Sequence, residues 1–322
     1  MIRYLARQLA TIIPTILATT LIAFVLIHAA PGDPASIFSQ DMVLAPQQRQ
    51  ALRTRYGLDQ PLPVQYARYL ASLAHGDLGF SYASHRPVSA LIAERLPATL
   101  LLTLSAVAAA FVGGVLLAVA ARKRVVDAGA SALTVACAAM PPFWLGLLLI
   151  LVFAVWLRWF PTSGYEDARE SSTGARHALD VLRHLFLPWL ALTLVQLPSV
   201  YRIARAGLAQ VGQEPFLTTM RAAGLPPAVV FRRYALRNML LPVVALFGVR
   251  LGYVVAGAAV VEVVFAWPGI GRLTLDAVAQ RDYPVLMGIY LVIAVSVTVA
   301  TLVTDLVYGL IDPRVRVAFV SH

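Results

Sequence analysis

The sequence predicts an all-α integral membrane protein with six transmembrane helices. Hydrophobic residues make up 59% of the 322 residues and charged residues only 13%, whereas soluble domains are about half apolar and a quarter charged. The mean hydropathy is +0.75. A helix needs about 20 apolar residues to cross the ~30 Å hydrocarbon core, and uncharged runs of this length indicate helices rather than barrel strands.

Each predicted span is a run of mainly Leu, Val, Ala and Ile without acidic or basic residues, except that Arg250 interrupts the fifth. The first run could be read as a secretory signal peptide, but its 23 residues exceed a typical signal core and Pro31 follows directly. We therefore retain it as a span. The six spans are residues 8–30, 96–121, 128–157, 184–201, 238–261 and 283–304.

The basic residues are distributed unequally between the two sides of the membrane. Six spans put both termini on one side, together with the loops 122–127 and 202–237. That side carries 13 Lys and Arg against 3 acidic residues, and the other side carries 12 of each. The positive-inside rule places the termini in the cytoplasm. The net charge of +10 is thus a topology signal, and we expect no nucleic-acid partner.

The chain divides into three parts: residues 1–30, an extracytoplasmic loop 31–95, and a core 96–322 that contains the cytoplasmic loop 209–237. The first loop is too long to be a simple connection. It predicts a small outer cap with one polar helix over 46–57 and an amphipathic helix over 63–73 that ends at Gly76. The second outer loop, 158–183, has mixed charge and a Ser/Thr/Gly stretch that indicates flexibility.

The cytoplasmic loop 209–237 predicts an isolated helix of about two turns over 215–223. Proline suits the first turn of a helix and glycine suits the position after its end, which Pro215 and Gly224 occupy. A helix resumes over 228–239. A short helix held at the membrane face by two spans has the form of a docking element. The alternative is a surface helix that lies on lipid headgroups.

The sequence predicts no catalytic, cofactor-binding or metal-binding residue. Lys123 is the only lysine and no glycine precedes it, so a nucleotide-binding P-loop is excluded. The six histidines form no ligand pattern, and Cys137 is expected to be a small buried hydrophobe. An integral membrane enzyme would need a nucleophile with its base, or a metal cluster, at membrane depth. A stand-alone channel or secondary transporter is disfavoured by the docking loop and by the lack of acidic residues within the spans.

Arg250 is the main ionisable residue inside a span, about 15 Å along the fifth helix. It either lines a water-filled path or pairs with Asp305 or with backbone carbonyls, and both interpretations stay open. Pro142 and Pro198 interrupt helical hydrogen bonds, and such positions usually face protein or a cavity. With Arg250 they are the candidates for a translocation pathway. Glu262, about 18 Å further along the same predicted helix, is expected at the outer surface.

Glycines at 248, 252 and 257 are expected to allow close helix contact in the fifth span.

Eleven stretches along nearly the whole chain, in family order, resemble the inner-membrane permease subunit of the peptide/nickel class of ABC importers. They are IRYL (2–5), APGDP (30–34), YGLDQPLPVQY (56–66), GDLG (76–79), ERLPAT (94–99), MPPFWLG (140–146), RAAGL (221–225), ALRNMLLP (235–242), VEVVFAWPGIG (261–271), RDYP (281–284) and DPRVR (312–316).

The resemblance implies a type I ABC importer permease fold in the bacterial inner membrane and an importer of short peptides, with nickel or metal chelates, glutathione or haem as alternatives. It implies a second homologous permease subunit, two ATPase subunits, an extracytoplasmic substrate-binding protein and membrane lipid as partners. The family couples to its ATPase through a loop of pattern E-A-A-x-x-x-G. The residues that this assigns to coupling are Pro215, Phe216, Thr219, Arg221, Ala222, Ala223, Gly224 and Leu225.

Two positions depart from the family pattern. Thr218 stands where the glutamate of the coupling pattern would be, so the coupling assignment depends on Gly224 and its neighbours. At Arg250 the family would have a neutral residue, often glutamine, which leaves open a pathway charge specific to this protein.

Overall fold

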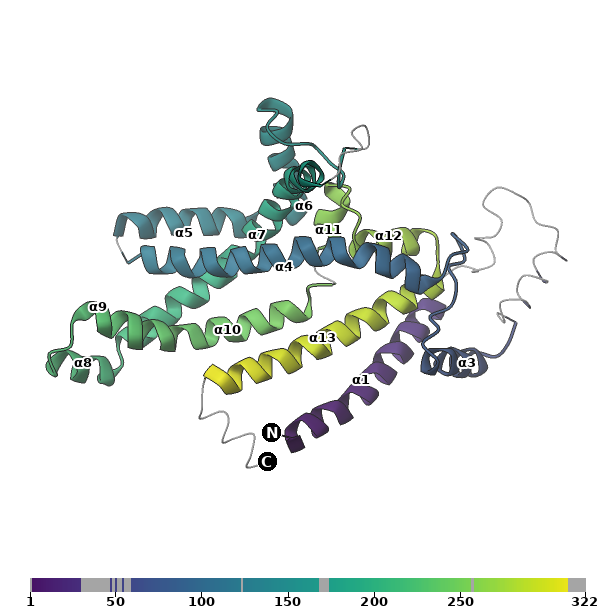
Figure 1. The fold of residues 1–322 in the computed structure, drawn as a ribbon, viewed down its shortest axis with the longest axis horizontal. Helices are drawn as coiled ribbons and strands as arrows, with labels where there is room; N and C mark the ends of the chain where they lie inside the picture. Colours follow the sequence, from purple (N-terminus) through teal and green to yellow (C-terminus); the bar gives the residue numbers. More distant parts are fainter. Residues whose placement is uncertain are drawn as a thin grey trace.

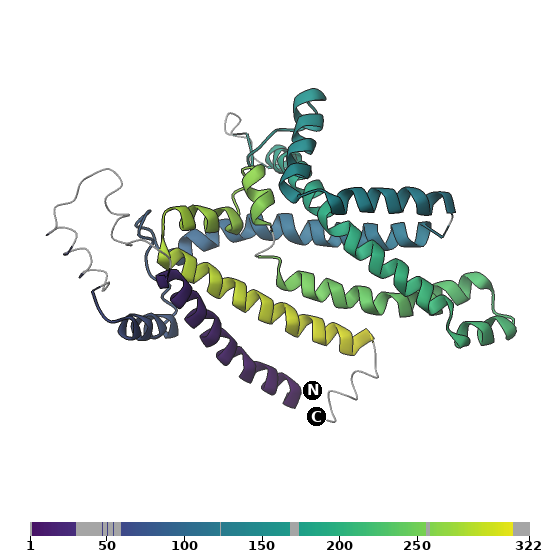
Figure 2. The same ribbon diagram turned by 180° about the vertical axis from the view of Figure 1, so that it is seen from behind.

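The computed structural model describes residues 2–29, 59–122, 124–167, 174–255 and 258–311, with residues 47, 50 and 54. The described residues form helices and no strand, with one isolated bridge between Phe80 and Pro87. This confirms the all-α prediction. Long helices run side by side along the molecule, with α8 at one end and α3 and α12 at the other (Figures 1 and 2).

The long helices coincide with predicted spans. They are α1 (Ile2–Ala29), α4 (Val88–Ala120), α7 (Ala175–Gly212), α10 (Leu236–Gly252) and α13 (Tyr283–Ile311). Within the described residues, four helices are long and apolar enough to cross a membrane, or five if one bent pair counts as a span. Residues Ile13–Ala29 of α1 form a shorter apolar helix.

The third predicted span, 128–157, is not one continuous helix, so that part of the prediction is wrong. α5 (Arg124–Ala139) is followed by α6 (Pro142–Leu149) and the π-helix η2 (Ile150–Trp156), bent by 110° from α5. Pro141 has extended ψ of 142°. Two successive prolines remove two backbone N–H donors, and each pushes the residue before it out of the helical region.

The fifth predicted span is also shorter than 238–261. α10 ends at Gly252, where Tyr253 and Val254 donate backbone hydrogen bonds to the carbonyls three residues earlier, at 3.1 and 3.2 Å. A separate short helix, α11 (Ala259–Val264), then leads to α12 (Ile270–Ala279) and α13. Glu262 on α11 is fully buried, so its predicted place at the outer surface is wrong.

The close helix contact predicted at the glycines of the fifth span is confirmed at Gly248, where an added Cβ would lie 2.0 Å from Thr304 Cγ2 on α13. At Gly252 the nearest atom, Val297 Cα, is 3.7 Å away, an ordinary contact. Gly257 lies outside the described residues.

The loop predictions have mixed outcomes. α3 (Leu62–Ala74) confirms the amphipathic helix, and Gly76 follows it with φ of +75°. The predicted polar helix over 46–57 lies almost entirely outside the described residues. The outer loop 158–183 is shorter than predicted, because α7 begins at Ala175 and its polar first turns continue the span.

The helices pack as a layered bundle. α4 lies along α7, α10 contacts both, α13 packs on α10, and α1 packs on α13 at the edge (Figures 1 and 2). Of the buried clusters, one surrounds Trp267 and Phe265 where α4, α6, α7 and α11 meet, and another joins α1 to the first turns of α13. Cys137 is free and buried, as expected.

Candidate coupling element and buried polar clusters

The helix predicted in the cytoplasmic loop is α8 (Pro215–Ala222), with Pro215 in its first turn. Its C-terminus is closed by two hydrogen bonds: Leu225 N–H donates to Met220 O at 3.3 Å, and Gly224 N–H donates to Arg221 O at 3.0 Å. This is the Schellman arrangement, which requires a left-handed residue after the helix. Gly224 has φ of +81°, a conformation that glycine adopts without the steric penalty of a side chain.

One face of α8 is anchored to the bundle. Leu217 is 2% exposed and packs in a hydrophobic cluster with Val211 at the end of α7 and Val230 of η3 (Val230–Ala235). Phe216, Met220 and Leu225 pack against this cluster, together with Phe231 and Tyr234. Met220 and Leu225 occupy the two positions whose apolar side chains commonly accompany a Schellman motif, and both pack against this cluster.

The other face of α8 is exposed. Of the residues assigned to coupling, Phe216 and Leu225 face the anchoring cluster, and the remaining six are exposed: Pro215, Thr219, Arg221, Ala222, Ala223 and Gly224. Thr218 is exposed as well. The sequence assignment missed Leu217 and Met220, which are the anchors. Their spacing from Phe216 along a helix was the available signal.

Two contacts connect the α8 end to neighbouring helices. The Arg122 guanidinium, in the turn between α4 and α5, lies 4.1 Å from the centre of the Phe231 ring. The short helix α9 (Pro227–Val229) leads from α8 into η3, which carries Phe231 and continues into α10. The turn between α4 and α5 therefore rests on the segment that holds α8.

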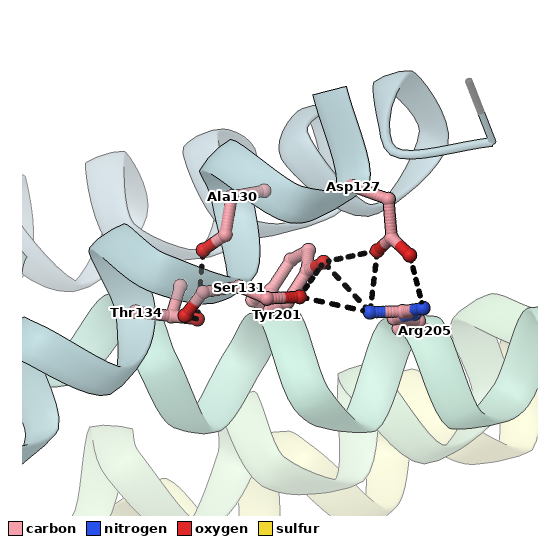
Figure 3. A network of polar contacts seen from close by, with 6 residues as sticks. All are labelled: Asp127, Ala130, Ser131, Thr134, Tyr201 and Arg205. Atoms are coloured by element: carbon pink, nitrogen blue, oxygen red, sulfur yellow. Dashed lines mark hydrogen bonds and ion pairs between the residues drawn. The ribbon is translucent and has the colours of Figure 1, made fainter. Parts of the chain in front are cut away.

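A polar network joins α5 to α7 near the same end (Figure 3). Both terminal guanidinium nitrogens of Arg205 pair with the Asp127 carboxylate, Nη1 with Oδ1 at 2.5 Å and Nη2 with Oδ2 at 2.6 Å. Tyr201 O–H donates to Asp127 Oδ1 at 3.2 Å, and Arg205 also donates to Ser131 Oγ at 3.0 Å. The Arg205 side chain is 45% exposed and that of Asp127 27%, so water screens this pair.

Two of the three pathway candidates lie close together. Arg250 on α10 donates to Ser199 Oγ on α7 at 3.4 Å, and buried Pro198 precedes Ser199. Ser199 Oγ donates in turn to Gln196 O at 2.8 Å. Pro142 begins α6 at the sharp bend and is exposed. The structure therefore groups Arg250 with Pro198 through Ser199 but places Pro142 in a different element.

Arg250 faces α7 rather than α13. Gly248 contacts Thr304 of α13, and a residue two positions further along a helix points about 200° away. The hydrogen bond to Ser199 agrees with this direction. The side chain of Asp305 lies outside the described side chains, so the predicted pairing alternative stays a prediction.

A fully buried carboxylate, Glu262, joins three elements near the α12 end. Its Oε1 accepts a hydrogen bond from Thr99 Oγ1 of α4 at 2.7 Å, and its Oε2 accepts one from the backbone N–H of Arg272 at 3.0 Å. Thr99 Oγ1 also accepts from Ile270 N–H at 2.7 Å. Burial raises the pKa of the Glu262 carboxyl, although hydrogen bonds from Thr99 and from the backbone of Arg272 and Gly271 oppose this shift.

Close packing around Glu262 requires glycine. A Cβ on Gly269 would lie 2.1 Å from the carboxyl carbon, and one on Gly271 would lie 2.3 Å from Ala259 Cα. Trp267, which has no exposed surface, donates its indole N–H to Ala98 O at 2.9 Å. The stretch 261–271 thus forms a buried polar corner between α11 and α12.

Asp282 is a second buried carboxylate, located directly before α13. It accepts hydrogen bonds from Ser81 Oγ at 2.5 Å and from the backbone N–H groups of Tyr82 and Ala83 at 3.1 and 3.2 Å. Only 2% of its surface is exposed. The turn that follows the outer cap is therefore tied to the start of α13. Sequence reasoning did not foresee the burial of Glu262 and missed Asp282, whose signal was an acidic residue directly before the predicted helix 283–304.

No group of three His, Cys, Asp or Glu side chains that could hold a metal ion occurs among the described residues. His177 and His184 each lie beside one carboxylate, Glu166 at 3.1 Å and Asp180 at 3.2 Å.

Comparison with known proteins gives matches over the whole chain. Residues 89–317 match the family model of the binding-protein-dependent transport system inner membrane component, and residues 1–103 match the N-terminal model of such membrane components. The di/tripeptide transport system permease DppB of Pseudomonas aeruginosa is 39% identical, with 98% of this chain and 99% of that protein covered. The oligopeptide transport system permease AppB of Bacillus subtilis is 36% identical, with 98% and 100% covered.

The glutathione transport system permease GsiC of Salmonella paratyphi A is also 36% identical, with 98% of this chain and 99% of that protein covered.

Proposed function

We propose that this chain is the permease subunit of an ABC importer of short peptides. The chain belongs to the family of binding-protein-dependent transport system inner membrane components, and the proposal starts from that membership. It is a multi-pass inner-membrane protein. The peptide assignment is supported by relatives that are named for di-, tri- and oligopeptide transport and match over nearly their whole length. Glutathione, itself a tripeptide, is the substrate in the name of another relative.

The observation that carries the coupling role is the two-sided character of α8. One face is anchored by Leu217 in a hydrophobic cluster, and the other exposes small or short side chains, among them Thr218, Thr219 and Ala222. Small side chains let another protein approach the backbone closely. An ATPase subunit that grips this face would move α8 together with the ends of α7 and η3, because the cluster connects all three.

The proposed orientation puts both termini and α8 in the cytoplasm. It is supported by the excess of Lys and Arg on that side of the sequence. α3 and α12 would then lie at the opposite, extracytoplasmic end, where a substrate-binding protein delivers the peptide.

The chain would supply half of the translocation pathway, and a second, similar permease would supply the other half. Two ATPase subunits would hydrolyse ATP, since this sequence contains no P-loop. Their closure on ATP would turn the cavity between the permeases outward by a rigid-body movement of the helices. The contribution of this chain is therefore mechanical.

The test is vanadate-sensitive ATPase activity of the complex purified through a tag on this chain. Di- to pentapeptides presented with the cognate binding protein should stimulate hydrolysis. If glutathione, haem or a nickel chelate stimulates hydrolysis and other peptides do not, the proposed substrate class is wrong and the permease role stands. A chain that copurifies with no ATPase would contradict the role itself.

The coupling assignment has a matched pair of glycine variants. An added Cβ meets nothing within 4 Å at either Gly224 or Gly212, but only Gly224 has a left-handed backbone. Gly224→Ala should uncouple ATP hydrolysis from peptide uptake, because a side chain destabilises that conformation by about 1–2 kcal/mol. Gly212→Ala should leave uptake unchanged. Equal uptake by both variants, in complexes of normal composition, would remove α8 from the coupling role.

Arg250 is proposed to attract the carboxylate of a peptide on its way through the membrane, with Ser199 and Pro198 beside it. Support comes from its direction toward α7 and from its neutral hydrogen-bond partner. Arg250→Gln should lower uptake of peptides with a free C-terminus more than uptake of C-terminally amidated peptides, and Arg250→Lys should retain the difference. Unchanged uptake of both peptide forms by Arg250→Gln would exclude Arg250 from the pathway.

A further inference from the structure

A groove of about 560 Å³ lies between α1 and α13 near the α12 end, and neither the proposed pathway nor the coupling element uses it. The α1 residues that line it are Thr19, Ile22, Ala23, Leu26 and Ile27. Their spacing of three and four places them on one face of the helix. α13 contributes Tyr283, Leu286 and Tyr290, which also share a face.

The groove opens toward the surface of the bundle. Ile22 is 59% exposed and Leu26 is 65% exposed, although both are large and apolar. α1 is the edge helix and packs on α13 (Figures 1 and 2). An exposed apolar groove between two helices of a membrane protein is surrounded by hydrocarbon chains.

Of the described residues that line the groove, only Arg281, in the segment between α12 and α13, is charged. Among the described residues, its guanidinium has no hydrogen-bond or ion-pair partner. The carboxylate next to it in the sequence, Asp282, is buried and occupied by Ser81 and by two backbone N–H groups. The positive charge of Arg281 is therefore not neutralised by its neighbour.

The backbone at Arg281 has an uncommon conformation, which it shares with three other non-glycine residues of the described chain. Its φ of +53° is left-handed, a conformation that residues other than glycine rarely adopt. A long cationic side chain nevertheless occupies the position and lines the groove together with Tyr283 and Tyr290.

We propose that this groove binds an anionic phospholipid, with an acyl chain along α1 and α13 and the headgroup phosphate on Arg281. The apolar walls and the cation at one end match the polarity of such a lipid, and arginine pairs with phosphate oxygens through charge-assisted hydrogen bonds. The lipid would fill the space between the edge helix and the core of the permease. This inference depends on the membrane placement of α1 and α13 and is independent of the transported substrate.

The experiment measures lipid bound to the intact complex, purified through a tag on this chain and washed in detergent. Phosphatidylglycerol or phosphatidylcholine with identical acyl chains is added, and the bound lipid is counted by native mass spectrometry. The wild type should prefer phosphatidylglycerol by about fivefold, the contribution expected of one surface arginine. Arg281→Gln should remove the preference, and Arg281→Lys should keep it.

Arg158 offers a matched control. It is also an exposed arginine in a left-handed conformation, with φ of +54°, but it does not line the groove. Arg158→Gln should leave the lipid preference unchanged. Leu26→Trp, which fills the groove without touching its charge, should reduce binding of both lipids.

Three results would overturn the proposal. They are equal retention of the two lipids by the wild type, an unchanged preference in Arg281→Gln, and equal losses in Arg281→Gln and Arg158→Gln. Crosslinking supplies a fourth: a Leu26→Cys variant that crosslinks to another protein chain in native membranes would identify a protein as the occupant. Since none of these readouts uses transport, failure here would leave the proposed importer role untouched.

Discussion

The two ends of the helix bundle use polar groups in opposite ways. At the α12 end, Glu262 and Asp282 are buried and accept hydrogen bonds from hydroxyl and backbone N–H groups. At the α8 end, the carboxylate of Asp127 is partly exposed and pairs with a half-exposed arginine. Leaving a buried hydrogen-bonding group without its partner lowers the stability of the fold substantially, whereas an exposed ion pair contributes little to stability.

The difference indicates which end of the protein changes its contacts easily. Separating α11, α12 and α4 would expose or orphan the Glu262 carboxylate and its donors. Separating α5 from α7 would only return Asp127 and Arg205 to water. If ATPase subunits act on the α8 end, as proposed, this division provides a fixed frame at the far end and contacts that separate at little free-energy cost at the α8 end.

The largest effect is expected from Glu262→Ala. It leaves the hydroxyl of Thr99 and the backbone N–H of Arg272 without their acceptor, at roughly 1–3 kcal/mol for each group left unpaired. The melting temperature of the detergent-solubilised protein should fall strongly. Glu94→Ala, at an exposed carboxylate paired with Arg86, should leave it nearly unchanged. Similar falls in both variants would mean that burial does not set the cost.

The pH dependence of stability sharpens the same point. The pKa of Glu262 is raised by burial, so the folded protein binds this proton more tightly than the unfolded chain does. Its contribution to stability is then largest at low pH and declines as pH rises from the ordinary carboxyl pKa through the raised value. Glu262→Gln should lose this decline. Melting curves of wild type and variant that stay parallel across the acidic range would contradict the shift.

A smaller loss is expected from Asp282→Ala. Ser81 and the backbone N–H groups of Tyr82 and Ala83 would lose their acceptor, at roughly 1–3 kcal/mol for the groups left unpaired. Limited proteolysis should cut the turn at 81–86 faster than in the wild type. Ser84→Ala in the same turn is the control, and an equal cleavage rate in both variants would argue against the tie to α13.

Arg122→Gln is expected to have a modest effect at the α8 end. It removes the cation above the Phe231 ring, a contact worth about 0.5–1 kcal/mol at an exposed site. Arg122→Lys should preserve most of it. The measurement is hydrogen exchange of the segment 227–235, which should accelerate in the glutamine variant only. No change in exchange would show that the contact does not hold η3.

Asp127→Asn should change stability least of all. The pair with Arg205 is screened by water, and exposed pairs contribute little. We expect an unchanged melting temperature, but a shift in the distance distribution between spin labels on α5 and α7, measured with and without ATP. A large drop in melting temperature would place this network with the buried clusters and would remove the contrast between the two ends.

Local sequence signals predicted the parts of the fold that are locally determined. Hydropathy located the long helices, and Pro215 with Gly224 bounded α8 to within one residue. The bend at Pro141 and Pro142 was visible as a proline pair, but its 110° angle depends on how α6 packs against α7 and α11. The hydropathy of 128–157 shows that the segment is apolar, but it gives no information about the direction in which the chain runs after the proline pair.

The buried clusters could not be predicted because their partners are distant in sequence. Glu262 meets Thr99, which is 163 residues away, and Arg205 meets Asp127 across 78 residues. Counting along one continuous helix put Glu262 at the surface, and the end of α10 at Gly252 invalidated that count. The prediction of α8 needed no such contact, since its start and stop signals lie within residues 215–224.

The length of α7 means that a small rotation of this helix moves its free end by a larger distance. Its 38 residues span about 57 Å, nearly twice the ~30 Å hydrocarbon core. Both Pro188 and Pro198 lie inside it, in the part buried by the other helices. A rod of this length that pivots there by roughly 10° sweeps its free end sideways by several ångströms, with almost no displacement at the pivot. A displacement of several ångströms at Gly212, the free end of α7, would thus produce a small rotation of the helix in the middle of the protein.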